Sequence, residues 1–177
     1  LGAAAHAVKG EARIAAGMHQ LGVGTPDGCA KAFHTVSVLT RLKPNKVLMA
    51  LDVSAAHQSL HRDYMHEQIA ERCPAMSLPM SVWYDQDEPT EHWWKTSRGE
   101  VLTVMAERGV DQGCPLASPA YGVTTAGIAN ESAELIKASD AAAQLLQYAD
   151  DTQAFTDPAN LHSPYNIISD KWARAGL

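Results

Sequence analysis

The chain has 177 residues, which suffices for one domain with a sizeable hydrophobic core but not comfortably for two. Hydrophobic residues make up 46% of it and the charges are scattered, so a disordered chain is excluded. No apolar run approaches the roughly 18 residues that a membrane span requires, and we therefore expect no membrane partner.

The charge balance argues against a simple nucleic-acid binder. The chain carries 14 Lys and Arg residues against 20 Asp and Glu residues, a formal net charge of −6, and it has no basic run. Domains that bind phosphates by charge are usually basic. If this chain handles nucleic acid, either the phosphate-binding surface lies outside it or its acidic residues carry out chemistry.

The cysteines and the first residue indicate the setting of the chain. Cys29, Cys73 and Cys114 are far apart and form no C-x-x-C pair, which favours reduced thiols and an intracellular location over a disulfide scaffold. The chain starts at Leu1, without an initiator Met or a signal peptide, and we interpret it as a fragment.

The first half of the chain predicts two helices, a strand and a third helix. Residues 1–20 are rich in Ala, and Thr25-Pro26 has the cap-plus-proline pattern of a helix that ends near Pro44. Residues 46–53 form a short apolar run, which is typical of a buried strand. Ser54 is a suitable cap for a helix from Ala55 to Cys73, which Pro74 ends.

The second half predicts two pairs of strands and two helices. Residues 92–107 indicate two strands around a turn, and Ser118-Pro119 opens a helix to about Ala138. Residues 145–155 indicate a hairpin with acidic residues at its tip, and Ser163-Pro164 starts a last helix. Because helices and antiparallel strands are mixed without βα alternation, the expected class is α+β, with an antiparallel sheet packed on helices.

Three carboxylates stand at predicted strand ends. Asp150 and Asp151 occupy the hairpin tip, and Asp52 ends the apolar run of residues 46–53. Adjacent carboxylates repel each other unless a cation neutralises them, and Mg²⁺ prefers oxygen ligands. Carboxylates from two neighbouring strands can clamp two Mg²⁺ ions roughly 3.5–4 Å apart, as phosphoryl transfer requires. The alternative interpretation is a solvated turn and a surface Asp.

A Gly- and Pro-containing loop supplies the third element of a site. In residues 109–119, Gly113 allows the backbone to approach a ligand closely, and the Gln112 amide can both donate and accept hydrogen bonds. By composition alone this segment is an ordinary loop that precedes a helix.

Taken in order, these segments resemble the motifs of reverse transcriptases. The stretch Leu51-Asp52-Val53-Ser54-Ala55-Ala56-His57 is similar to the first palm motif, and residues 109–119 are similar to the second, of form G-V-x-Q-G-x-P-L-S-P. Tyr148-Ala149-Asp150-Asp151 matches the Y-A-D-D box. Residues 20–28 resemble a fingers segment typical of non-LTR retrotransposon enzymes, and Ala175-Gly176-Leu177 resembles the start of the next palm motif.

The resemblance implies an RNA-directed DNA polymerase fragment with a right-hand palm. Residues 1–45 would be part of the fingers and residues 46–177 a palm that stops before the thumb. It implies two Mg²⁺ ions, replaceable by Mn²⁺, on Asp52, Asp150, Asp151 and the Val53 carbonyl.

The same resemblance implies the substrates and their contacts. Val53, His57, Gln112, Gly113 and Tyr148 would line the nucleotide and primer-end sites. The partners would be an RNA template, a DNA primer, dNTP and the rest of a larger polyprotein with a thumb. An attached endonuclease is left open. The location would be nuclear for a eukaryotic retrotransposon.

Several positions depart from the family pattern. His57 stands where the family usually has Phe or Tyr, the wall that excludes a ribose 2′-hydroxyl, so we expect relaxed sugar discrimination. Asp111 replaces a frequently basic residue, and Cys114 and Ala117 replace residues that are usually Asp or Asn and Ser. We therefore expect this fragment alone to be weak or inactive.

Two other functions compete with the polymerase interpretation. A non-catalytic relict of a retrotransposon polymerase agrees with the acidic balance and the altered second motif. A zinc-binding hydrolase would use His57 and His61, four residues apart on a predicted helix, with His66 and Cys73 downstream. The zinc interpretation is weaker because His66-Glu67 lacks the second His of H-E-x-x-H.

Overall fold

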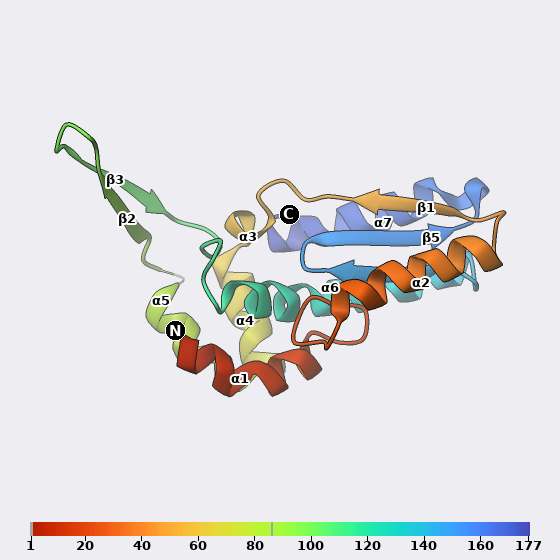
Figure 1. Cartoon of the computed structure of the whole chain (residues 1–177), viewed down its shortest axis with the longest axis horizontal. Coiled ribbons are helices and arrows are strands. Elements are labelled where there is room, and N and C mark those ends of the chain that lie inside the picture. The colour runs from red at the N-terminus through yellow and green to blue at the C-terminus, as the bar shows by residue number, and fades with distance from the viewer. Residues whose placement is uncertain (1, 86) are drawn as a thin grey trace.

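A three-stranded antiparallel sheet occupies the right-hand part of the computed structural model, which describes residues 2–85 and 87–177 (Figure 1). Its strands are β1 (Val47–Leu51), β5 (Asp151–Thr156) and β4 (Gln144–Tyr148), in the spatial order β1-β5-β4. The middle strand, β5, is paired on both sides, which satisfies its backbone groups. The predicted strand and the predicted hairpin are therefore confirmed as parts of one sheet.

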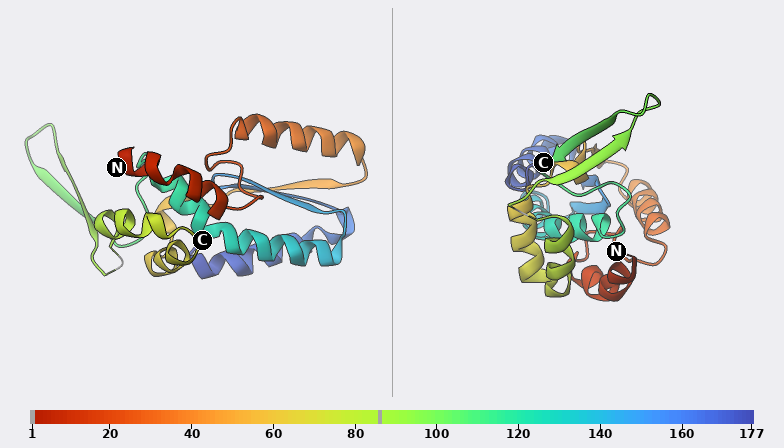
Figure 2. Two further views of the ribbon diagram at one scale, coloured as in Figure 1. Left: turned by 90° about the horizontal axis from the view of Figure 1, so that it is seen from below. Right: turned by 90° about the vertical axis from the view of Figure 1, so that its left-hand side faces the viewer.

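Helices cover both faces of this sheet (Figure 2). One face carries α2 (Gly28–Leu42), and the other carries α6 (Ala117–Ser139) with α7 (His162–Trp172) beside it. The molecule is thus a helix–sheet–helix sandwich at one end. The predicted α+β class, with an antiparallel sheet packed on helices, is confirmed.

The long helix α6 is buried along most of its length. Small residues dominate it, and a Cβ on Gly122 would collide with the Val23 side chain. Its two buried threonines, Thr124 and Thr125, donate to carbonyls four residues earlier at 2.7 and 2.9 Å, so their hydroxyls are satisfied. Residues 120–129 are buried without interruption, so neighbours surround this part of the helix, whereas its second half keeps an exposed face that includes Glu131 and Glu134.

Further helices pack around the first half of α6. These are α1 (Gly2–Ala15), α4 (Arg62–Arg72) and α5 (Ser77–Trp83), which share one hydrophobic core with it. A second core joins the latter half of α6 to the sheet, α7 and the short helix α3 (Ala56–Ser59). Single turns of 3₁₀ helix lie at Pro74–Met76, Pro158–Asn160 and Ala173–Ala175. Helix α1 shares its core with α6, and the predicted domain boundary at 45/46 stays a prediction.

A two-stranded ribbon projects from this body (Figure 1). It consists of β2 (Thr90–Lys95) and β3 (Val101–Ala106), as the sequence predicts, and its side chains are largely exposed, with Trp93 at 70%. The Arg62 guanidinium holds the base of the ribbon by donating to the Asp85 and Glu88 carbonyls and to the Thr90 hydroxyl. The same guanidinium donates to the Gly109 carbonyl at 3.1 Å.

The predicted helix over residues 55–73 is wrong as one element, because it breaks between α3 and α4. In a continuous helix His61 N–H would donate to the His57 carbonyl. Instead, the His57 carbonyl accepts from Val110 at 2.8 Å, and His61 N–H donates to the Ala175 carbonyl at 2.9 Å. Ser54 is not the cap of α3, whose N-cap is Ala55, in the left-handed region at φ 51°. Distant backbone groups therefore take the hydrogen bonds that the helix would need.

The second predicted helix begins later than Pro26. Its N-cap is Asp27, also left-handed at φ 53°, and no side chain caps α2. The Thr25 carbonyl instead accepts from Gly28 N–H in a turn that precedes the helix. No helix within residues 2–85 and 87–177 combines the length and apolarity of a membrane span.

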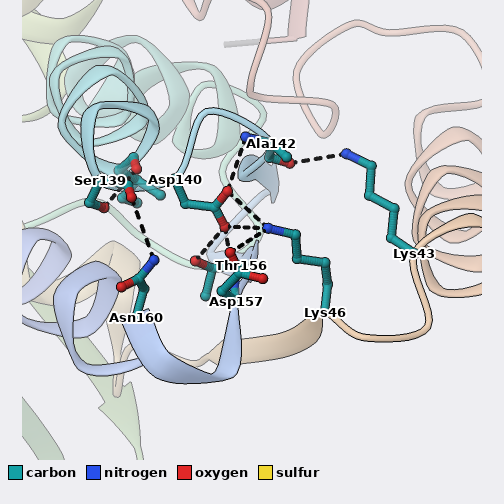
Figure 3. Close-up of polar contacts among 9 residues, drawn as sticks. Lys43, Lys46, Ser139, Asp140, Ala142, Thr156, Asp157 and Asn160 are labelled. Carbon is teal, nitrogen blue, oxygen red and sulfur yellow. Dashed lines mark hydrogen bonds and ion pairs between the residues drawn. The ribbon is translucent and has the colours of Figure 1, made fainter.

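Ion pairs between Lys46 and two aspartates, of which Asp140 is buried, tie the start of β1 to the ends of α6 and β5 (Figure 3). The ammonium of Lys46 lies 2.8 Å from Asp140 and 2.9 Å from Asp157. Asp140 also accepts from the backbone N–H groups of Ala142 and Asp157 and from the Thr156 hydroxyl. The hydrogen bond from Lys46 is the main reason that the pKa of Asp140 falls to about 2, against burial, which raises it.

We expect Asp140→Asn to lower the free energy of unfolding at pH 7 by about 1–3 kcal/mol, because buried donors lose a charged acceptor. The pKa of Asp140 is lower in the folded chain than its ordinary 3.8. Its stabilisation is therefore fully present above about pH 4 and is lost as the pH falls toward 2. Urea unfolding between pH 7 and pH 2 should show the wild-type advantage shrinking over that interval. The exposed Asp170→Asn is the control, and an equal effect from it would contradict the prediction.

Candidate active site

Asp52, Asp150 and Asp151 lie at one end of the strands of the three-stranded sheet. We call this end of the sheet the acidic edge. Leu51 is paired with Thr152, so Asp52 follows directly after β1 at the level where β5 begins. Tyr148 is paired with Asp151, which leaves Ala149 and Asp150 as the two-residue turn of the hairpin. The structure therefore brings Asp52 to the same end of the sheet as Asp150 and Asp151, which follow it by 98 and 99 positions in the sequence. Asp52 and Asp151 are exposed, and Asp150 is half-buried.

The turn that carries Asp150 is held in an unfavourable conformation. Ala149 has φ 54°, in the left-handed region, which costs a residue with a Cβ about 1–2 kcal/mol. Residues 19–22 run along the edge strand β4 and contact this turn. The local sequence alone would not hold Ala149 in this region, so the surrounding structure must do so.

Tyr121, from α6, lies beneath the acidic edge. Its side chain is fully buried, and its hydroxyl has no hydrogen-bond partner within the part of the chain that the structure describes. Burial is the main cause of its raised pKa, and the negative charges of Asp150 and Asp52 raise it further. An unpartnered hydroxyl beside two carboxylates is costly to the fold, and such groups are typical of binding sites.

His57 lies against the other side of this tyrosine. Its imidazole ring stacks on the Tyr121 ring with 5.0 Å between centroids and 30° between planes. The predicted site residue His57 is thereby connected to the acidic edge through Tyr121. Sequence reasoning missed Tyr121, because an aromatic residue on an apolar helix gives the same signal as ordinary core packing.

The loop of residues 109–115 is attached to the helix that carries His57. Gly109 donates to the Leu60 carbonyl and Val110 to the His57 carbonyl, each at 2.8 Å. Gly109 is required there, since it has φ 65° and a Cβ would collide with the backbone of His57 and Gln58. Gln112 and Gly113 follow as exposed residues, and the space beside Gly113 is open. No hydrogen bond within residues 2–85 and 87–177 joins these two to the acidic edge.

Asp111 faces the ribbon. One of its carboxylate oxygens lies 3.1 Å from His92 Nε2, and the other accepts from the Tyr84 hydroxyl at 3.4 Å. Asp111 N–H in turn donates to the Tyr84 hydroxyl at 3.2 Å. The acidic replacement in the second motif is thus engaged at the base of the ribbon.

The remaining predicted site residues lie nearby. Val53 packs at the edge of the second core, and with Asp52 it lines a cavity of about 280 Å³ bounded by α7 residues including Trp172. Tyr148 is exposed at the end of β4, and its ring lies close to Gly28 at the start of α2.

The donor set suits Mg²⁺ without forming a complete cage. Within residues 2–85 and 87–177, no three His, Cys, Asp or Glu side chains converge as a metal-binding group. Mg²⁺ is commonly bound by one or two carboxylates together with substrate phosphates and water. Asp52 and Asp150 fit that description, and both lie close enough to the Tyr121 hydroxyl for their charges to raise its pKa.

The histidines of the zinc interpretation are separated. Because the helix breaks at Leu60, His57 stacks on Tyr121, whereas His61 lies against Gly176 near the end of the chain. His66 Nε2 is 2.6 Å from the Tyr84 carbonyl, and Cys73 is buried in the first core. The expectation that His57 and His61 share one helix face is therefore wrong.

No protein-family model and no curated protein matches this chain. Solved structures do resemble it, and three of them are telomerases from Candida. Telomerase from Candida albicans, in complex with a TWJ fragment of telomeric RNA, superposes with a TM-score of 0.69 at 14% identity. The match covers 98% of this chain and 33% of that one.

Two structures of telomerase from Candida tropicalis agree with this result. The protein truncated from its C-terminal domain gives a TM-score of 0.66 at 12% identity, over 97% of this chain and 36% of that one. The apo protein gives 0.65 at 12% identity, over 98% and 33%. Telomerase is a reverse-transcriptase-family enzyme. The chain shares the fold of these telomerases. The chain spans about a third of these telomerase chains, and the likeness extends to the fold alone.

We expect Tyr121→Phe to raise the free energy of unfolding by about 1 kcal/mol, because it removes a buried hydroxyl that has no partner and keeps the ring on His57. Thermal unfolding of the protein without metal or nucleotide measures this. Tyr165→Phe, which removes an exposed hydroxyl, should leave the midpoint unchanged. A loss of stability in Tyr121→Phe would show that the hydroxyl is already satisfied.

Proposed function

We propose that this chain is the palm and part of the fingers of an RNA-directed DNA polymerase, most like the non-LTR retrotransposon enzymes. The observation that carries the proposal is the acidic edge. Asp52 and Asp150, from separate segments of a reverse-transcriptase fold, lie close to the buried Tyr121 hydroxyl. The reaction joins a primer 3′-hydroxyl to the α-phosphate of a dNTP and releases pyrophosphate.

Mg²⁺ would be held by Asp52, Asp150 and the Val53 carbonyl, with Asp151 in a supporting role, and Mn²⁺ would substitute for it. When bound, two such ions stabilise the negative charge that develops during phosphoryl transfer. The chain itself contributes the fixed separation of its carboxylates, since β1 and the β4–β5 turn belong to one hydrogen-bonded sheet. Alignment of the primer end with the α-phosphate supplies the rest of the rate enhancement.

Four residues would bind the nucleotide and the primer end. The exposed Gln112 and Gly113 present an amide and an open backbone to the incoming dNTP. His57, supported from behind by Tyr121, would stand against the sugar. Tyr148, exposed beside the acidic turn, would lie near the primer end.

The proposed partners are an RNA template and a DNA primer, bound largely by further parts of a longer polyprotein that includes a thumb. One of the similar telomerases was solved with RNA, which supports an RNA partner for this fold. The net charge of −6 agrees with a phosphate-binding surface elsewhere in the polyprotein. A nuclear location follows if the source is a eukaryotic retrotransposon.

We expect Asp52→Asn and Asp150→Asn each to reduce primer extension by at least about 10³-fold, or about 4 kcal/mol of transition-state stabilisation. The assay uses an RNA template, a DNA primer and dNTP with Mg²⁺ or Mn²⁺, on this chain and on a form extended through the thumb. Asp170→Asn on α7 is the matched control and should extend primer like the wild type. If neither wild-type form yields a metal-dependent product, the chain is a non-catalytic relict and the proposal fails.

We expect His57→Phe to lower the use of rNTP relative to dNTP. A phenyl ring keeps the stacking on Tyr121. It would stand against the sugar of the incoming nucleotide without offering a hydrogen bond to a 2′-hydroxyl. The ratio of kcat/KM for a matched dNTP and rNTP measures this in the extended form. An unchanged ratio would show that His57 does not contact the sugar.

A further inference from the structure

Residues 19–22 run alongside strand β4 and form a parallel bridge with it, next to the turn of Ala149 and Asp150. The His19 carbonyl accepts from Gln147 N–H, and Leu21 N–H donates to the Gln147 carbonyl, both at 2.7 Å. Gly22 allows the segment to come this close, because a Cβ there would collide with the backbone nitrogen of Ala149. A segment far away in sequence is thus fixed against the hairpin that carries Asp150.

Gln20 uses this position to hold both peptide groups of Ala149. Its Nε2 donates to the Ala149 carbonyl at 2.9 Å, and its Oε1 accepts from Ala149 N–H at 2.8 Å. The same Oε1 accepts from Gly22 N–H at 2.8 Å, so the amide is also fixed from its own side. The side chain is only 2% exposed.

These bonds act on the residue whose conformation sets the direction of Asp150. Ala149 is left-handed at φ 54°, and a non-glycine residue leaves that region readily unless its neighbours prevent it. Asp52 stands on a different strand, so the gap between the two carboxylates depends on this turn. Repulsion between the carboxylates favours a wider gap, and the two bonds from Gln20 oppose that change.

We propose that Gln20 is a positioning residue for the Asp150 carboxylate, which it holds at metal-binding distance from Asp52 by clamping Ala149. The inference rests on the proposed function for its effect on catalysis. It does not depend on polymerase activity for its effect on metal binding.

Gln20→Met tests the clamp, because it keeps the length of the side chain and removes both hydrogen bonds to Ala149 together with the one from Gly22. Gln68→Met is the matched control, since Gln68 is a glutamine only 8% exposed that accepts a hydrogen bond from Arg72 on α4, in the first core. Mn²⁺ binding, followed by electron paramagnetic resonance, should weaken at least fivefold in Gln20→Met and stay within twofold in Gln68→Met. The Mg²⁺ concentration for half-maximal primer extension should rise by the same factor in Gln20→Met, with KM for dNTP nearly unchanged.

A second variant separates positioning from a general loss of packing. Ala149→Gly favours positive φ without the clamp, as the first position of a two-residue hairpin turn often requires. Added to Gln20→Met, it should restore at least half of the lost Mn²⁺ affinity, whatever its effect on the thermal midpoint. Recovery of the midpoint without recovery of affinity would overturn the proposal.

The remaining outcomes are also decisive. Equal Mn²⁺ affinity in the wild type, Gln20→Met and Gln68→Met overturns the clamp while leaving the polymerase proposal standing. A wild type that binds Mn²⁺ in a Gln20-dependent manner but extends no primer supports the clamp and overturns the polymerase proposal. A folded wild type that binds no Mn²⁺ overturns both the clamp and the assignment of Asp52 and Asp150 as metal ligands.

Discussion

The whole architecture depends on α6, whose residues 120–129 are buried without interruption. Small residues along this helix let α1 and α4 approach one half of it, while α7 and the sheet pack on the other. Gly122 and Gly127 mark two of the closest approaches, against Val23 and the Arg72 guanidinium. A larger residue at either position would push apart layers that meet only through this helix. Tyr121 is the largest fully buried side chain on this helix, and its hydroxyl lies near Asp150 and Asp52.

The two ends of the sheet differ in how their carboxylates are surrounded. At the end where β5 finishes, Asp140 is neutralised by Lys46 and accepts several hydrogen bonds, so its charge is stabilised within the fold. At the acidic edge, Asp52, Asp150 and Asp151 share one end of the sheet without converging as a metal-binding group, and the Tyr121 hydroxyl has no partner within the described residues. The arrangement around Asp140 stabilises the folded chain, whereas the arrangement at the acidic edge lowers its stability. A buried polar group without a hydrogen-bond partner, next to several carboxylates, is expected where a protein binds a cation or a substrate.

Local pattern and spacing predicted the strands, the hairpin with its acidic tip and the helix after residue 118, because each depends on nearby residues. The break at Leu60 could not be predicted in this way, since it arises from hydrogen bonds to Val110 and Ala175, far away in the chain. Gln20 belongs to the segment of residues 20–28 that resembles a fingers motif, but its hydrogen-bond partner Ala149 is 129 positions away. No local rule connects the two residues. Tyr121 was hidden for a different reason: its sequence context is that of a core aromatic. The resemblance to reverse transcriptases predicts that the carboxylates act together; the structure places them at one end of the sheet, and their role as metal ligands stays a prediction.

The guanidinium of Arg62 connects two parts of the molecule that the strands alone would leave independent. It donates to three groups at the base of the β2–β3 ribbon and to the Gly109 carbonyl at the start of the loop that carries Gln112. Gly109 and Val110 are in turn bonded to α3, where His57 lies. The ribbon cannot tilt relative to the body without straining these bonds. Anything that binds the exposed ribbon is therefore mechanically coupled to the residues that would face an incoming nucleotide.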